Sequence, residues 1–212
     1  MNSVQIYIFR HGETDWNRER RFQGHTDIPL NQQGRQQALQ LKTELAPFSP
    51  ELILSSDLSR ALETAQIVSE GLFVPIHVSE GLREARLGNP EGQLRDDIIK
   101  IYGEESWQQW LSIEAKDIDF AFPNGETKRQ QRDRALKFIL QEIEGLPELK
   151  SLAVSTHGGT LRRLVHHCEG APNEPIAIPN CSLYHLEVLR LEKKWLYHGP
   201  LNISDAADKL FG

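Results

Sequence analysis

Two histidines in this sequence stand beside glycine, each one or two residues after a short apolar run. His11 follows Arg10 and precedes Gly12, whereas His157 precedes a pair of glycines. A neutral imidazole is a nucleophile or a proton carrier, and a guanidinium beside it attracts anionic groups. Glycine at such a position permits close approach of the backbone to a ligand. The two clusters therefore predict chemistry on an anionic substrate, for which a phosphate is the natural candidate.

Arg60 and Glu84 follow two other apolar runs of the chain. Arg60 lies in SSDLSRAL, after Leu52–Leu54, and Glu84 lies in LREARLG, soon after Pro75–Val78. A second guanidinium adds to an anion site, and a carboxyl group can give a proton to a leaving oxygen. Taken singly, these residues also have structural explanations, such as a surface ion pair or a hydrogen-bonded core histidine. Their common place after apolar runs favours one shared functional site.

Expected strands and helices alternate along the chain. This alternation predicts an α/β fold with a mostly parallel sheet, which would position these residues. Strands are expected at Val4–Phe9, Glu51–Leu54, Pro75–Val78 and Leu152–Val154, with edge strands in Ile176–Tyr197. Helices are expected near Gly34–Leu45, Leu58–Leu72, Leu94–Leu111, Glu126–Glu144 and Leu161–Cys168, the second with Ser55-Ser56-Asp57 as its N-cap. Ligands of open α/β sheets bind beyond the carboxyl ends of the strands, so the charged residues above are expected in one pocket.

Composition excludes several classes of partner. The chain has 24 Lys and Arg against 30 Asp and Glu, a net charge of −6, which argues against nucleic acid as a partner. No apolar stretch reaches membrane-spanning length, and no signal peptide is expected. Cys168 and Cys181 fit no metal-ligand spacing and indicate a reduced, cytoplasmic protein. No metal and no cofactor are predicted.

Three further features are weaker candidates. His166 and His167 are adjacent on an expected helix, so they point in different directions and make a poor metal pair. The run Arg18–Arg21 has mixed charge and indicates a phosphate-facing or solvated loop. Trp107 and Trp110 could stack on a substrate, but their i, i+3 spacing is more typical of core packing.

Four motifs, RHGET, SSDLSRALETA, LREARLGNPEG and STHGGTLRRL, resemble those of the histidine phosphatase superfamily, in the same order and over nearly the whole chain. This family includes cofactor-dependent phosphoglycerate mutases. The resemblance implies one domain over residues 1–212, with three layers, a sheet flanked by helices and a lid-like segment at about 92–122. It implies that His11 is the nucleophile that becomes phosphorylated and that Glu84 is the proton donor. The phosphate-binding residues that it implies are Arg10, Arg60, His157, Asn17 and Gly158, with Gln23 and Gly24 on the substrate side.

The same motifs leave two activities open. The segment between Gly92 and Pro123 is short for a glycolytic mutase and offers few cations for a bisphosphate, namely Arg95, Lys100 and Lys116. The stretch EARLGNPEG resembles the phosphatase branch, whereas ERRFQG and PNCSLYHLE resemble small proteins often named phosphoglycerate mutase. We therefore expect a phosphomonoester hydrolase for a small phosphorylated metabolite, working as a monomer or homodimer, with 2-/3-phosphoglycerate interconversion as the alternative. A non-catalytic phosphate-sensing domain ranks last, because the expected nucleophile and acid are both present.

Overall fold

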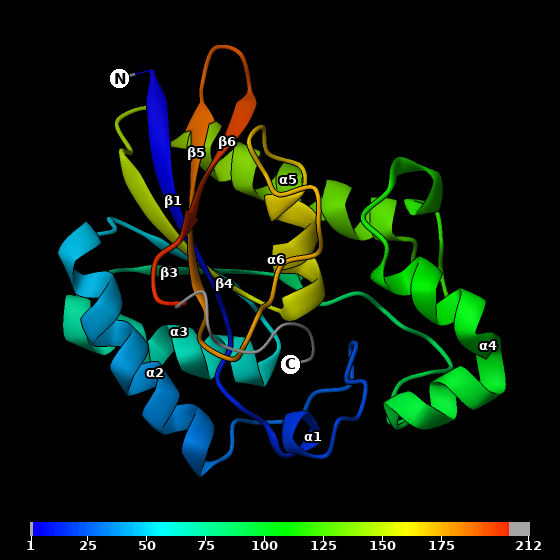
Figure 1. Cartoon of the computed structure of the whole chain (residues 1–212). Coiled ribbons are helices and arrows are strands. Elements are labelled where there is room, and N and C mark those ends of the chain that lie inside the picture. Colours follow the sequence, from blue (N-terminus) through cyan, green and yellow to red (C-terminus); the bar gives the residue numbers. More distant parts are fainter. Residues whose placement is uncertain (1, 204–212) are drawn as a thin grey trace.

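A six-stranded sheet lies at the centre of the computed structural model, which describes residues 2–203 (Figure 1). Its strands are β1 (Ser3–Arg10), β2 (Ile53–Ser56), β3 (Ile76–Ser79), β4 (Ser151–Thr156), β5 (Leu183–Leu189) and β6 (Lys194–Pro200). The order across the sheet is β3-β2-β4-β1-β5-β6. The first four of these strands are parallel, and β5 and β6 are antiparallel to their neighbours. The prediction of a mostly parallel sheet is confirmed.

Helices cover both faces of the sheet, so the predicted three layers are confirmed. Side chains alternate along β1, and Tyr7 and Phe9 pack against α2 (Gln32–Leu45) and α3 (Ser59–Leu72). Ile6 and Ile8 point to the opposite face and pack with α5 (Lys128–Gly145) and α6 (Gly158–Val165). This alternation is the period of two that buries a strand on both faces.

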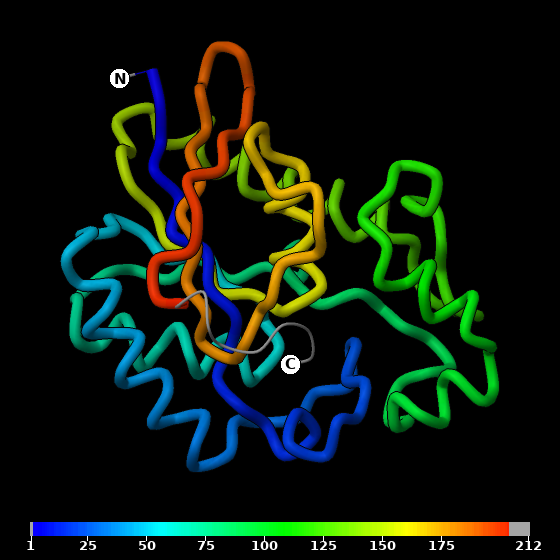
Figure 2. Tube along the Cα trace, in the orientation of Figure 1, coloured from blue at the N-terminus to red at the C-terminus, as the bar shows by residue number. Residues whose placement is uncertain are grey.

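The segment from about residue 92 to 122 lies to one side of the sheet and has a small apolar core of its own (green in Figure 2). It contains α4 (Arg95–Leu111), which is kinked at Gly103, where φ is 84°. Trp107 and Trp110 are buried in this core with Phe122. The expectation that these tryptophans pack in a core is therefore confirmed.

Short helices complete the described chain: α1 (Asp15–Arg18), η1 (Ala46–Phe48), η2 (Glu80–Leu82) and η3 (Ala115–Asp117). Between residues 2 and 203, no helix is long and apolar enough to span a membrane.

Two expectations about elements were wrong. Ser55 and Ser56 belong to β2 and do not cap α3, whose N-cap residue is Leu58. Asp27, from the loop after β1, accepts hydrogen bonds from the backbone N–H and the hydroxyl of Ser59, so a distant carboxylate replaces the local cap. Ile176–Tyr197 does not form two edge strands either. β5 pairs with both β1 and β6, and β6 is the edge.

Candidate active site

His11 lies just beyond β1 and is almost inaccessible to solvent, yet it lines a cavity of about 220 Å³. Its backbone N–H donates to the carbonyl oxygen of Thr156, which continues the pairing of β1 with β4. The side-chain Nδ1 lies 2.7 Å from the carbonyl oxygen of Gly12. Because a carbonyl oxygen can only accept, Nδ1 carries the proton and Nε2 keeps its lone pair.

The surroundings of His11 keep its imidazole neutral. Burial, followed by the positive charges of Arg60 and Arg10, holds the pKa of His11 well below its ordinary value. A neutral imidazole with an unprotonated Nε2 is the nucleophilic form of the side chain.

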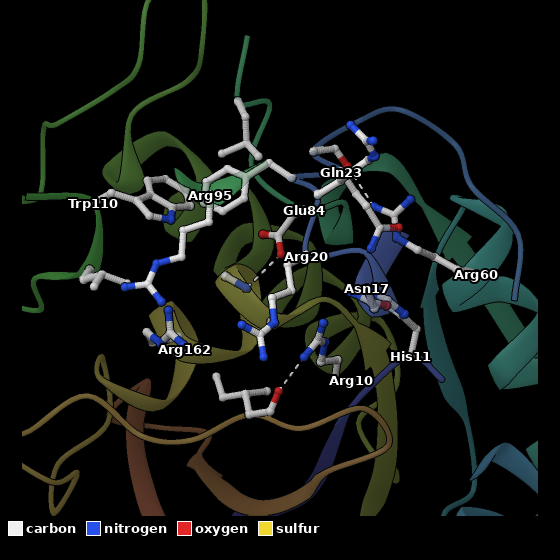
Figure 3. Close-up of a pocket in the computed structure, with 18 of the residues that line it drawn as sticks. Arg10, His11, Asn17, Arg20, Gln23, Arg60, Glu84, Arg95, Trp110 and Arg162 are labelled. Carbon is white, nitrogen blue, oxygen red and sulfur yellow. Dashed lines mark hydrogen bonds between the residues drawn. The ribbon is translucent and has the colours of Figure 1, made fainter. Parts of the chain in front are cut away.

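Arg10 and Arg60 place two buried guanidinium groups at this cavity (Figure 3). Arg10 is the last residue of β1 and donates from Nη1 to the carbonyl oxygen of Ile178. Arg60, in the first turn of α3, donates from its two Nη atoms to the carbonyl oxygens of Thr26 and Gly24. Burial lowers the pKa of each arginine to about 10, so both remain cationic at neutral pH. Within residues 2–203, neither Nε atom has a hydrogen-bond partner.

The sequence predicted His157 in the same pocket, but His157 lies beside His11 and does not line the cavity. It follows β4, is fully buried, and its ring centroid lies 5.2 Å from that of His11. Its Nε2 is 2.8 Å from the hydroxyl oxygen of Ser56, whereas its Nδ1 has no partner among the described residues. Burial and the charge of Arg60 hold the pKa of His157 well below its ordinary value.

Glu84 lines the same cavity, in the loop after η2. Its Oε1 accepts hydrogen bonds from Gln131 Nε2 at 2.7 Å and from the backbone N–H of Ala85 at 2.8 Å. Its Oε2 accepts from the backbone N–H of Gly159 at 2.8 Å. Three donors thus fix both carboxylate oxygens, and the sequence prediction that Glu84 and His11 meet at one cavity is confirmed.

Glycine has two different roles around the cavity. A Cβ at Gly12 would lie 2.3 Å from the carbonyl oxygen of Gly34, so Gly12 is needed for close backbone packing and not, as expected, for approach of a ligand. A Cβ at Gly159 would lie 2.3 Å from Oε1 of Glu84. The second position therefore keeps space for the carboxylate at the cavity wall.

The remaining predicted binding residues also line the cavity. Asn17 is held by the N-terminal cap of α1, where its Oδ1 accepts from the backbone N–H of Thr14 at 3.1 Å. Gly24 has a φ of 55°, and its carbonyl oxygen is one of the acceptors for Arg60. Gln23 is buried, and Gly158 is the first residue of α6.

Four arginines of the cavity wall were not identified from the sequence as site residues: Arg20, Arg21, Arg95 and Arg162. For the loop that contains Arg20 and Arg21, the sequence indicated either a phosphate-facing or a solvated position. Arg162 follows the HGG motif at helical spacing, which was the available signal for it. Arg95 begins α4, whose position against the sheet no local motif specifies.

The cavity has a local charge opposite to that of the whole chain. Six arginines line it, and among the described residues Glu84 is the one carboxylate that does so. Trp107 and Trp110 form part of the same wall, so the two tryptophans pack into a core and also face the cavity. The described residues contain no group of three or more His, Cys, Asp or Glu that could hold a metal ion.

The sequence matches the histidine phosphatase superfamily (branch 1) over residues 6–198. It is 33% identical over 199 residues to the probable phosphoglycerate mutase GpmB of Escherichia coli, covering 92% of this chain and 89% of that protein. Bacillus stearothermophilus YhfR is 31% identical, with a TM-score of 0.81 over 95% of this chain and 98% of its own. Mycobacterial glucosyl-3-phosphoglycerate phosphatase shares the fold, with a TM-score of 0.79 at 23% identity over 95% of this chain and 100% of its own. The chain belongs to the histidine phosphatase superfamily, whose members are phosphatases or mutases.

Proposed function

We propose that this protein is a phosphomonoester hydrolase that acts on a small phosphorylated metabolite through a phosphohistidine at His11. The observation that carries the proposal is the hydrogen bond from Nδ1 to the carbonyl oxygen of Gly12. It leaves a neutral Nε2 at a cavity that two buried guanidinium groups also line. An unprotonated Nε2 beside two guanidinium groups is suited to attack on a phosphoryl group, whereas a structural histidine needs neither feature.

In the first half-reaction, the lone pair of Nε2 forms a bond to phosphorus while the bond from phosphorus to the leaving oxygen breaks. Protonated Glu84 gives its proton to that oxygen, so that the leaving group departs as an alcohol. In the second half-reaction, ionised Glu84 takes a proton from water as the water oxygen attacks phosphorus. The Nε2–phosphorus bond then breaks, which releases phosphate and regenerates His11.

The cations act on the phosphoryl oxygens in both half-reactions. Arg10 and Arg60 stabilise the charge of the three equatorial oxygens in the transition state. Ser56 accepts from the backbone N–H of Leu58 and can donate its own hydrogen to Nε2 of His157. The proton of His157 then lies on Nδ1; the ring lies beside His11 but does not line the cavity, so no phosphoryl contact is assigned to it.

The positions of the cations in the segment from about residue 92 to 122 favour a phosphatase over a mutase. Of the three cations in that segment, Arg95 alone lines the cavity. Lys100 and Lys116 are exposed and pair with Asp97 and Glu114. A mutase needs cations in its cavity that retain a bisphosphate between its two transfers. Lys100 and Lys116 do not line the cavity. Phosphoglycerate mutase stays the second candidate because of the name of the Escherichia coli relative.

The proposal places the enzyme in the cytoplasm, as a monomer or homodimer without a cofactor. Cys168 and Cys181 are both buried and unpaired with each other, which is compatible with a reducing compartment.

The test is a screen of phosphate release over a library of phosphorylated metabolites, run beside a 2-/3-phosphoglycerate interconversion assay with and without a bisphosphoglycerate primer. We expect phosphate release from at least one library member to exceed any interconversion by a wide margin. Primed interconversion that outruns every hydrolysis would assign the protein to the mutases instead.

A further inference from the structure

Arg60 is oriented by a short loop, residues 24–26, because both of its Nη atoms are bound to backbone carbonyl oxygens of that loop. Nη1 donates to the carbonyl oxygen of Thr26 at 2.9 Å, and Nη2 donates to that of Gly24 at 2.8 Å. These two carbonyl groups hold the guanidinium at the cavity only while the loop keeps its conformation. The groups that fix this loop therefore decide where the positive charge of Arg60 lies.

Glu91 binds the loop with both of its carboxylate oxygens. Its Oε1 accepts from the backbone N–H of His25 at 3.2 Å, and its Oε2 accepts from the backbone N–H and the hydroxyl of Thr26 at 3.0 and 2.8 Å. Oε1 also accepts from the backbone N–H of Leu87 at 3.0 Å, which ties the loop to the segment that follows Glu84. Hydrogen bonds to an ionised acceptor are roughly twice as strong as those between neutral groups. One carboxylate thus fixes the backbone of the loop.

The loop also packs closely against this carboxylate. Gly24 has a φ of 55°, and a Cβ at this position would lie 2.3 Å from Oε1 of Glu91, so glycine is required on both counts. The side chain of His25 extends the network to the proposed acid, since its Nε2 lies 2.8 Å from the carbonyl oxygen of Glu84. A loop of three residues therefore contacts both Arg60 and Glu84.

Glu91 itself does not line the cavity, so it has no contact with the site of the phosphoryl group. Its charge nevertheless acts on Arg60. Burial lowers the pKa of Arg60, and the negative charges of Glu84, Asp27 and Glu91 oppose that lowering. Glu91 therefore influences the site through the loop and through Arg60.

We propose that Glu91 is a positioning residue, which holds residues 24–26 so that their carbonyl groups orient Arg60 toward the phosphoryl group. The proposal rests on the proposed function for the identity of the group that Arg60 binds. It adds a residue on which the reaction depends without touching the substrate.

The test is a double-mutant cycle between Glu91 and Arg60, with nitrophenyl phosphate as the substrate. Glu91→Gln replaces one acceptor oxygen with an NH₂ group, which cannot accept from the N–H groups of the loop. It should lower kcat/KM by about 10- to 100-fold, the effect of losing hydrogen bonds to a charged group. In Arg60→Ala, which has no guanidinium to orient, the same substitution should lower kcat/KM by no more than about 2-fold.

Two further variants keep the test valid if Glu91→Gln folds poorly. Thr26→Val is close to isosteric and removes the hydroxyl donor alone, so it should lower kcat/KM by about 3- to 10-fold in the wild type and hardly at all in Arg60→Ala. Glu51→Gln is the matched control, because Glu51 also accepts two backbone N–H donors, but at the opposite end of β4 from the cavity. It should leave kcat/KM unchanged. Glu91→Gln and Thr26→Val losses that are absent, or equally large in Arg60→Ala, would overturn the proposal.

A binding measurement separates this proposal from the proposed function. Calorimetric titration of His11→Ala with inorganic phosphate should show about 10-fold weaker binding when Glu91→Gln is added. The same addition should have no further effect once Arg60→Ala is also present. That coupling, found in a protein whose wild type hydrolyses no phosphomonoester, would retain the positioning role and refute the phosphatase. Hydrolysis by the wild type, with rate and binding losses that simply add, would retain the phosphatase and refute the positioning role.

Discussion

Glu84 is the residue whose proposed role can be separated most cleanly from a structural one. Gln131, Ala85 and Gly159 hold its two oxygens in place, so the carboxyl group is presented to the cavity in a fixed orientation. A group that gives a proton to the leaving oxygen is needed in proportion to how basic that oxygen is. Its importance should therefore depend on the substrate, whereas a structural contribution should not.

We predict that Glu84→Gln slows phosphoenzyme formation from alkyl phosphates by roughly 10²–10⁴-fold, the range of general-acid catalysis. Formation from a nitrophenyl phosphate should suffer far less, because the phenolate leaves without a proton. Single-turnover kinetics measures both. Gln131→Met is the matched control, since it removes one hydrogen bond of Glu84 and keeps the acid. An equal loss on both substrates in Glu84→Gln would mean that another group donates the proton.

Arg60 should stabilise the transition state directly. Its two Nη atoms are bound to backbone carbonyl oxygens, which fixes the plane of the guanidinium at the cavity. Arg60→Ala should raise the activation free energy by about 3 kcal/mol, as for loss of one preorganised donor. Arg60→Lys should restore only part of the rate, because an ammonium cannot reproduce the planar fork. Steady-state kinetics on a folded variant checks this, and turnover like that of the wild type would make Arg60 a structural residue.

At the scale of elements, two buried cations attach α4 to the body of the molecule. Nζ of Lys128, at the start of α5, lies 2.6 Å from the carbonyl oxygen of Gln109 and 2.8 Å from that of Ser112. Arg163, in α6, donates to the carbonyl oxygens of Trp110 and Ser112. Both cations meet the end of α4 where free carbonyl groups and the helix dipole are negative. The C-terminal half of α4, with Trp107 and Trp110, is thereby held against the cavity.

Lys128 leads to a prediction about pH. Burial lowers the pKa of Lys128 from 10.5 to about 8, so the folded state releases this proton at a lower pH than the unfolded chain. Between about pH 8 and pH 10.5 the unfolded state binds more protons than the folded state. The contribution of Lys128 to the free energy of unfolding must therefore rise with pH. The neutral amine still has two N–H groups for its two acceptors, so the contacts persist.

The difference in unfolding free energy between wild type and Lys128→Met should therefore increase from pH 7 to pH 10 in urea titrations. Lys137→Met, which removes an exposed lysine of the same helix, should show no such trend. A difference that stays constant or falls with rising pH would contradict the buried state of Lys128.

The sequence predicted those parts of the fold and site that depend on local patterns. Apolar runs located the parallel strands, and glycine or charged residues after them located the residues that line the cavity, because strand ends meet at one edge of a sheet. Other parts depend on long-range contacts and could not be predicted in this way. Asp27 caps a helix 32 residues further along the chain, and β5 lies inside the sheet although its sequence alternates like an edge strand. Arg95 reaches the cavity only through the packing of α4.

At the scale of the whole molecule, an acidic protein presents a basic cavity. The net charge of −6 repels anions weakly at long range, whereas the arginines of the cavity act at short range, where screening by salt is less effective. In the proposed mechanism these guanidinium groups supply the positive charge that a metal ion would supply in other phosphatases.

Activity should therefore persist in EDTA, and vanadate, which mimics the phosphoryl group, should inhibit. Phosphate release assayed before and after chelation is the measurement. Loss of activity on chelation, with recovery on adding a divalent cation, would refute the mechanism even if the substrate class is right.

Rapid quenching tests most directly whether His11 becomes covalently phosphorylated. Wild-type enzyme mixed with a radiolabelled phosphomonoester and quenched within a turnover should contain a label that is stable to base and labile to acid. Peptide mapping should place that label on His11, and His11→Ala should lose both the label and turnover. A label that maps to another residue, or a His11→Ala enzyme that keeps label and turnover, would contradict the account.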